Sequence, residues 1–205
     1  MLVNLAVLQE LIAGAIPDRD ALLWRDRRLT YAELNARSRR VGRALRRLGL
    51  GCRTERAALQ PWESGHDHVA IYCYNGTEFV ETMYGAWKAR AAFVNVNYRY
   101  VADELRYVLR QADARAIVYH AAFAPLLDEV RRDVDSLRHF IQVPDESGNP
   151  LLPGAVEYER WLAAESEHHS SASSGFCQCG LYAPSRQTLR NSGVRLLLLW
   201  RAIRQ

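Results

Sequence analysis

The sequence is almost without lysine. Of its 27 basic side chains only Lys88 is a lysine, and the others are arginines. A mechanism that needs a lysine must therefore use Lys88 or a residue outside this chain. The preference for arginine is typical of a GC-rich coding sequence, so compositional drift explains it better than selection for arginine chemistry.

Long apolar runs are also missing. No run approaches the roughly 20 residues that a helix needs to span a bilayer. The first stretch, Met1–Ile16, lacks the basic start and the apolar core of a secretion signal, because polar residues interrupt it at helical spacing. We therefore expect no membrane span and, as the default location, the cytoplasm.

Cysteine is scarce, and the cysteines form no recognisable set. They are Cys52, Cys73, Cys177 and Cys179. Two are isolated and two lie one residue apart, which fits neither a disulfide framework nor a familiar zinc site. His66 and His68 flank Asp67, a weak hint of a metal or acid–base site, but a solvated loop is the better interpretation. We expect no metal site.

Acidic residues are absent from the end of the chain. Residues 168–205 contain five arginines and no acid, whereas residues 1–167 are close to neutral, so the net charge of +4 belongs to the tail. No basic motif of a nucleic-acid-binding domain accompanies it. We expect no nucleic-acid partner.

Several motifs that would identify an enzyme class are absent too. The chain has no Gly-x-x-x-x-Gly-Lys phosphate loop, no Gly-x-Gly-x-x-Gly after a strand, no His-Glu-x-x-His and no Gly-x-Ser-x-Gly. The usual dinucleotide folds, zinc proteases and α/β-hydrolases are therefore disfavoured.

What is present is an alternation of short apolar strands and helices. Strands are predicted at residues 69–73, 91–96, 115–119 and 139–143, with helices between them at residues 76–90, 101–112 and 125–132. This order is the signature of βαβ units. Right-handed crossovers place the helices on the faces of a parallel sheet. The sequence thus predicts an α/β fold.

A smaller unit is predicted before this alternation. Asn4 is expected to cap a first helix that ends near Ile16. Its apolar face contains Leu5, Leu8, Leu11 and Ile12. Two short strands at residues 21–24 and 28–30 then lead into a helix over residues 31–48, which ends at Gly49. Residues 52–67 have no clear period and are predicted to form a long loop.

The helix over residues 31–48 has an apolar face and an arginine face. The apolar stripe contains Leu34, Val41, Leu45 and Leu48. The opposite face contains Arg39, Arg40, Arg43, Arg46 and Arg47. We expect the arginine face to be solvated, with an acidic partner as the alternative.

Three segments resemble conserved boxes of adenylate-forming enzymes. Leu29–Leu34 is similar to their first box, a short strand entering a helix. Tyr84–Val96 is similar to their second box, which commonly has Lys-Ala-Gly before a strand; here Arg90 replaces that glycine. Asn95–Tyr100, followed by Glu104–Tyr107, resembles the acyl-CoA synthetase branch in particular. The resemblance extends over about residues 4–165.

The resemblance implies an enzyme that joins a carboxylic acid to ATP, releases pyrophosphate and passes the acyl group to coenzyme A. The intact relative would use ATP, magnesium and coenzyme A, with a fatty acid as substrate. A Gly-, Ser- and Thr-rich phosphate loop ending in Pro-Lys-Gly should follow a helix at residues 158–164. No such loop follows. We therefore expect an inactive N-terminal fragment without catalytic residues or cofactors of its own.

Candidate ligand residues lie where strands end, because open parallel sheets bind ligands at the C-terminal ends of their strands. The ends are Tyr74-Asn75-Gly76, Asn97-Tyr98-Arg99 and His120. Asn97 and Arg99 could donate hydrogen bonds to a phosphate or carboxylate. The resemblance places Asn97, Tyr98 and Arg99 on the acyl and coenzyme A side. Turn formation is the alternative role of Asn75 and Asn97.

The character of the chain changes after Glu165. Residues 166–174 are rich in serine and histidine, and an isolated leucine run stands at Leu196–Leu199. We expect residues 1–165 to form a partial synthetase domain and residues 166–205 to form a basic tail that is disordered or translated out of frame. A membrane-surface helix at residues 194–203 is a weaker alternative. For the whole chain, the alternative is a non-enzymatic α/β interaction module or a decaying gene product.

Overall fold

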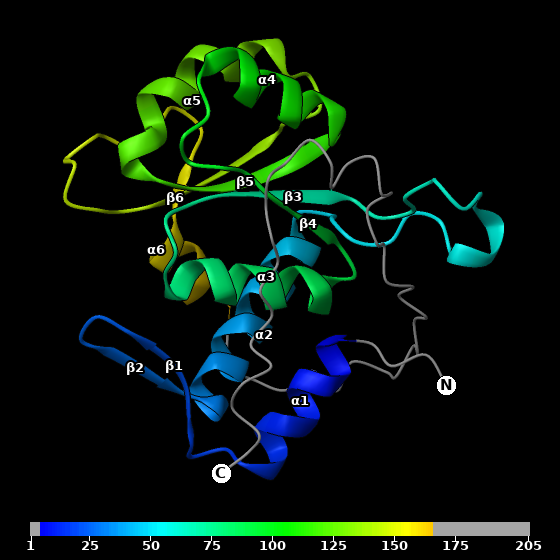
Figure 1. The fold of residues 1–205 in the computed structure, drawn as a ribbon, viewed down its shortest axis with the longest axis vertical. Coiled ribbons are helices and arrows are strands. Elements are labelled where there is room, and N and C mark those ends of the chain that lie inside the picture. The colour runs from blue at the N-terminus through cyan, green and yellow to red at the C-terminus, as the bar shows by residue number, and fades with distance from the viewer. Residues whose placement is uncertain (1–4, 166–205) are drawn as a thin grey trace.

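A computed structural model describes residues 5–165 of the chain. Its centre is a five-stranded sheet between two layers of helices (Figure 1). The strands are β3 (His68–Tyr72), β4 (Ala92–Asn95), β5 (Ala114–His120), β6 (His139–Val143) and β7 (Val156–Glu157). They pair in parallel in the order β4-β3-β5-β6-β7. The predicted α/β fold with a parallel sheet is confirmed.

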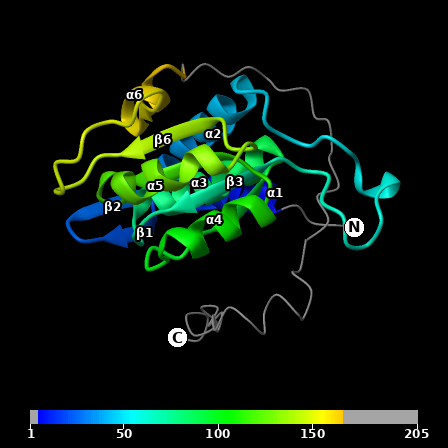
Figure 2. The same ribbon diagram turned by 90° about the horizontal axis from the view of Figure 1, so that it is seen from above.

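Helices cover both faces of this sheet (Figures 1 and 2). One face carries α2 (Tyr31–Arg47), α3 (Thr77–Ala89) and α6 (Tyr158–Ala163), and the other carries α4 (Ala102–Gln111) and α5 (Ala124–Val130). Val69 and Ile71 of β3 belong to the first core, whereas Ala70 and Tyr72 belong to the second. Successive side chains of a strand point to opposite faces, so a strand buried on both faces is apolar throughout.

The remaining elements precede the sheet or connect its strands. They are α1 (Leu5–Ala15), an antiparallel hairpin of β1 (Asp20–Trp24) and β2 (Arg27–Thr30), and single turns at Arg56–Ala58, Ala121–Phe123 and Arg131–Asp133. The predicted helices and strands are present with ends shifted by a residue or two. The sequence does not predict β7, because two residues carry no detectable period. Within residues 5–165, no helix combines the length and apolar character needed to cross a bilayer.

α2 begins and ends as its sequence predicts. Thr30 Oγ1 accepts a hydrogen bond from Glu33 N at 3.2 Å, and Glu33 Oε2 accepts one from Thr30 N at 2.8 Å, which forms a capping box. Gly49 has a φ of 78°, and its N–H and that of Leu50 bond back to carbonyls of the last turn. The buried stripe includes Leu34, Val41 and Leu45.

Two arginines on the arginine face of α2 form ion pairs within the protein. Arg47 is exposed, yet its Nη2 lies 2.6 Å from Glu165 Oε1. Arg39 Nε lies 3.1 Å from Glu10 Oε1 of α1. These pairs tie α2 to α1 and to the end of α6, in addition to the predicted contact with solvent.

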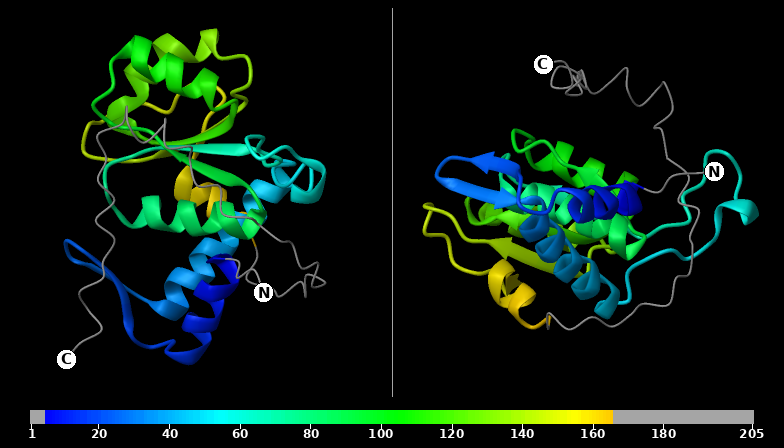
Figure 3. Two further views of the ribbon diagram at one scale, coloured as in Figure 1. Left: turned by 45° about the vertical axis from the view of Figure 1, so that its right-hand side comes forward. Right: turned by 90° about the horizontal axis from the view of Figure 1, so that it is seen from below.

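The face of α1 that packs against the rest of the protein is not the face that its sequence predicts. Its buried residues are Ala6, Gln9 and Ala13. The exposed residues Val7, Leu8 and Leu11 form what we call the α1 stripe. α1 packs against α2 and α3 (Figure 3). Its buried alanines lie on that side, whereas Leu5 and Ile12 of the predicted apolar face are only half-buried and Leu11 is 65% exposed. The predicted cap, Asn4, lies outside the described residues.

α2 and α3 cross at a pair of glycines. A Cβ at Gly85 would lie 2.3 Å from Val41 Cγ1, closer than atoms of two side chains can approach. A Cβ at Gly42 would lie 3.0 Å from Lys88 Cβ. The close packing of the two helices that support the sheet therefore depends on the missing side chain at position 85.

α3 ends at a residue in the left-handed region. Arg90 is the C-cap, with φ 63° and ψ 31°, a conformation that costs a non-glycine residue roughly 1–2 kcal/mol. Its guanidinium pairs with Glu55 of the long loop. The adenylate-forming enzymes that the sequence resembles commonly have glycine at this position, which agrees with a requirement of the backbone.

Glycine at position 90 is expected to be more stable than alanine by about 1 kcal/mol. Arg90→Gly and Arg90→Ala both lose the pairing with Glu55, so their difference reports the strain of the left-handed conformation, reduced by the larger unfolded-state entropy of glycine. Urea unfolding of the two variants measures that difference. An alanine variant more stable than the glycine variant would show that the left-handed conformation carries no strain here.

Candidate ligand site at the strand ends

The residues expected to bind ligands come together at one edge of the sheet. β3, β4 and β5 are parallel neighbours, so their C-terminal ends lie at the same edge. The ring centroid of Tyr74, after β3, lies 5.2 Å from that of Tyr98, after β4. It lies 5.4 Å from the ring of His120, at the end of β5. The structure thus joins three predicted segments into one surface.

The sequence does not predict one residue of this surface. Phe123, in the single turn after β5, has its ring centroid 4.7 Å from that of Tyr74 and 6.4 Å from that of Tyr98. We call Tyr74, Tyr98, His120 and Phe123 the strand-end cluster. The sequence shows only an aromatic residue three positions after a strand end, and that spacing does not reveal that the ring returns to the edge.

Asn97, Tyr98 and Arg99 are all exposed at this edge. Asn97 Oδ1 accepts a hydrogen bond from Arg99 N at 3.0 Å, which is the turn-forming role of asparagine. The Arg99 guanidinium carbon lies 5.5 Å from the Tyr98 ring centroid. No carboxylate of residues 5–165 pairs with Arg99. Arg99 can therefore offer its donors to an anionic ligand.

His120 is held as a neutral imidazole. Its Nδ1 accepts a hydrogen bond from Tyr74 N at 3.2 Å, which leaves the proton of the neutral ring on Nε2. Burial lowers the pKa of His120, and the charges of Asp145 and Glu78 only partly oppose this effect. At neutral pH the ring presents a single N–H donor at the strand-end cluster.

Two polar side chains behind the cluster are chemically inert. Burial raises the pKa of the Cys73 thiol, whose Sγ lies 3.5 Å from Val118 O. Burial also raises the pKa of Tyr72 to about 12. A thiolate or phenolate therefore does not form near neutral pH. The edge can bind a ligand through rings and donors, but these side chains supply no nucleophile.

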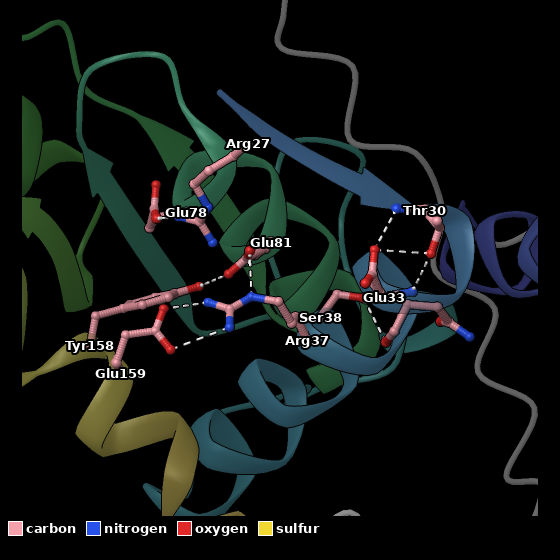
Figure 4. Close-up of polar contacts among 10 residues, drawn as sticks. Arg27, Thr30, Glu33, Arg37, Ser38, Glu78, Glu81, Tyr158 and Glu159 are labelled. Carbon is pink, nitrogen blue, oxygen red and sulfur yellow. Dashed lines mark hydrogen bonds and ion pairs between the residues drawn. The ribbon is translucent and has the colours of Figure 1, made fainter. Parts of the chain in front are cut away.

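A second polar cluster lies between α2, α3 and α6 (Figure 4). Arg37 Nε donates to Glu81 Oε1 at 2.6 Å, and Arg37 Nη2 donates to Glu159 Oε1 at 2.5 Å. Tyr158 OH donates to Glu81 Oε2 at 2.9 Å. We call these four residues the helix clamp, because they fix α6 against the two longer helices.

Burial and hydrogen bonding together shift the pKa values of Arg37 and Tyr158 in the helix clamp. The Glu81 side chain is fully buried, so its charge needs a partner. Burial alone would lower the pKa of Arg37, but its hydrogen bonds to Glu81 and Glu159 outweigh burial and raise it. Burial and the Glu81 charge raise the pKa of Tyr158. Tyr158 therefore donates to Glu81 as a neutral phenol, and the role of the clamp is structural.

The only lysine also has a structural role. Lys88 Nζ donates to Glu10 Oε1 at 2.8 Å and to Asn35 Oδ1 at 3.0 Å. Its side chain is 5% exposed, and burial lowers its pKa. Lys88 therefore joins α3 to α1 and α2, and it does not reach the strand-end cluster as a phosphate-binding lysine would need to.

The His66-Asp67-His68 segment supports the long loop. Asp67 is buried, and its Oδ2 accepts hydrogen bonds from Gly51 N and Arg53 Nε, each at 2.9 Å. His66 Nδ1 lies 2.7 Å from Arg90 O. The interpretation of this segment as solvated is therefore wrong at Asp67, which needs these donors in a buried position. Across the described part of the chain, no three His, Cys, Asp or Glu side chains are placed to hold a metal ion.

Known proteins are similar to this chain in sequence and in fold. Residues 12–173 match the family model described as AMP-binding enzyme. The chain is 51% identical over 155 residues, 76% of its length, to the medium-chain acyl-CoA ligase Mig of Mycobacterium avium, and it spans 28% of that ligase.

Solved structures agree with the sequence comparison. The N-terminal domain of FACL13 from Mycobacterium tuberculosis matches 85% of this chain with a TM-score of 0.65 at 23% identity; the match spans 39% of that structure. The anthranilate CoA ligase AuaEII matches 82% of this chain with a TM-score of 0.67 at 21% identity, across 28% of its own chain. These likenesses show the fold. With the family match over residues 12–173, they establish that the chain belongs to the AMP-binding enzymes and corresponds to their N-terminal part.

Proposed function

We propose that this chain is the N-terminal part of an acyl-CoA synthetase, which joins a fatty acid to ATP, releases pyrophosphate and passes the acyl group to coenzyme A. The observation that carries the proposal is the 51% identity to the M. avium medium-chain acyl-CoA ligase. The intact enzyme would use ATP, magnesium and coenzyme A. No residue of this chain is assigned to ATP or magnesium.

Within this proposal, Asn97, Tyr98 and Arg99 lie on the acyl and coenzyme A side. The exposed Arg99 has no carboxylate partner in residues 5–165, and an arginine fork matches the oxygens of a phosphate. Coenzyme A carries phosphates, so its anionic end suits Arg99. Asn97 holds the turn that presents Tyr98 and Arg99. These residues bind substrate and take no part in bond making.

The proposed domain boundary lies at Glu165. Residues 1–165 form a partial domain, and residues 166–205, which lie outside the described residues, do not contain the expected phosphate loop. A single inserted or deleted base near the codons for residues 165–174 would account for the loss of acidic residues. Translating the gene beyond that point in all three forward frames should reveal a Gly- and Thr-rich loop ending in Pro-Lys-Gly.

The chain alone is expected to show no fatty-acid-dependent exchange of pyrophosphate into ATP. Preorganised donors of the missing phosphate loop supply the electrostatic stabilisation that adenylate formation needs. A chimera in which residues 1–165 replace the matching part of the M. avium ligase is expected to catalyse the exchange. Activity of the chain alone, or a folded chimera without activity, would contradict the proposal.

Arg99→Gln in this chimera is expected to raise the KM for coenzyme A by about tenfold, the effect of one lost charge-assisted contact. Pyrophosphate exchange should stay unchanged, because coenzyme A enters after the adenylate has formed. The matched control is Arg115→Gln, at the opposite end of β5, where the arginine pairs with Asp113. Equal losses in both half-reactions would assign Arg99 a structural role instead.

A further inference from the structure

The β1–β2 hairpin adds little to the core at its tip. Leu29, at its base, is its only buried residue in the structure's described range. Leu23, near the tip, is 60% exposed, and Trp24 is 39% exposed. Apolar burial therefore holds the base of the hairpin in place and leaves the tip without a comparable anchor.

Backbone hydrogen bonds fix the base of the hairpin. Tyr31 N donates to Arg19 O at 2.9 Å, and Ala32 N donates to Pro17 O at 3.0 Å, so the chain is closed where the hairpin leaves α2. Within the hairpin, Arg28 Nη1 lies 3.0 Å from Asp20 Oδ2 across the two strands. These contacts keep the two strands paired to each other when the contacts of the tip are broken.

Its tip rests on the edge of the sheet that carries the strand-end cluster. Arg27 Nη1 donates to Glu78 Oε1 at 2.5 Å; Glu78 is in the first turn of α3, just after β3 (Figure 4). A Cβ built at Gly76 would lie 3.7 Å from Trp24 Nε1, so the indole lies against the same turn. A second pair, Arg25 with Glu146 at 4.0 Å, is largely exposed and contributes little.

We infer that the β1–β2 hairpin is a strap over the Gly76–Glu78 turn at this edge of the sheet and is latched by the Arg27–Glu78 ion pair. The Glu78 side chain is 14% exposed and the Arg27 side chain is 47% exposed. Solvent reaches the Arg27 end of the pair, so salt weakens the pair from that side, although less than it weakens a fully exposed pair. Opening uncovers Glu78 and Gly76 beside Tyr74. This inference goes beyond the proposed function and does not depend on it.

Carboxylate labelling and the Trp24 indole signal together test the strap on the full chain. A water-soluble carbodiimide with an amine, read by mass spectrometry, reports access to Glu78, and the ¹H–¹⁵N signal of the indole reports whether the tip moves. Raising the salt concentration is expected to increase Glu78 labelling by about two- to fivefold. The Trp24 signal should shift and sharpen over the same salt range.

Arg27→Gln should show the high labelling already at low salt, with no further response to salt. Arg28→Gln, which removes only the pair within the hairpin, should leave Glu78 labelling unchanged. Glu81 is fully buried, so its labelling would report unfolding and it serves as the folding control. If Glu81 becomes labelled in Arg27→Gln, that variant is set aside and the salt response of the unmodified chain tests the strap. Labelling of Glu78 that is independent of salt, or that rises while Trp24 stays fixed, overturns the strap.

Discussion

Arg37→Ala is expected to lower the free energy of unfolding by about 3–5 kcal/mol, the usual result of removing one partner of a buried pair. The substitution leaves the fully buried Glu81 charge with only the Tyr158 hydroxyl as a donor in the helix clamp. It also releases Glu159, so the first turn of α6 keeps only the Tyr158–Glu81 hydrogen bond of the helix clamp. Urea unfolding followed by circular dichroism measures the loss.

The control for this prediction is Arg28→Ala, in the exposed hairpin. Arg28 pairs with Asp20, and their side chains are 71% and 45% exposed, so its removal should change stability by less than about 1 kcal/mol. A double replacement, Arg37→Met with Glu81→Leu, should be more stable than Arg37→Ala, because no unpaired charge remains buried. A similar small effect of Arg37→Ala and Arg28→Ala would show that the clamp does not hold α6.

Gly85→Ala is expected to cost about 1–3 kcal/mol, the range for overfilling a packed core. The added Cβ would lie 2.3 Å from Val41 Cγ1 and 2.4 Å from Val41 Cβ, and Val41 is fully buried. α2 and α3 must therefore separate, which also disturbs the sheet core beneath them. The thermal midpoint and the urea midpoint should both fall.

Gly14→Ala provides the matched control, because Gly14 lies in α1 with nothing within 4 Å of an added Cβ. There the same substitution should raise stability by roughly 0.5–1 kcal/mol through helix propensity alone. Opposite signs at positions 85 and 14 would separate the steric effect from the general preference of helices for alanine. A stabilising Gly85→Ala would mean that the crossing of α2 and α3 is looser than the structure describes.

The helices and strands were predictable because each depends on the pattern of a few consecutive residues. β3 is apolar from Val69 to Tyr72, and α2 has its N-cap at Thr30 and ends at Gly49. The order of strands in the sheet was not predictable, because pairing joins segments without a shared local pattern. The buried face of α1 was also misjudged: its leucines dominate the periodicity, but its alanines permit the close approach to neighbouring helices.

The candidate site was predictable only in part. Asn97, Tyr98 and Arg99 follow a recognisable strand, so parallel-sheet logic places them at the ligand edge. Phe123 and the helix clamp were missed. Arg37 lies in an arginine-rich helix and looks like its neighbours, while its partner Glu159 is 122 positions away. No spacing rule connects residues that are brought together only by tertiary packing.

The α1 stripe is expected to affect how long this chain persists in a cell. Val7, Leu8 and Leu11 form a short apolar segment near the N-terminus, at 42%, 42% and 65% exposure. Chaperones and quality-control proteases recognise exposed apolar segments, and their triage sets abundance alongside thermodynamic stability. Shielding the stripe, for example with Leu11→Gln, should therefore lengthen the half-life of the chain in vivo with little change in its unfolding free energy.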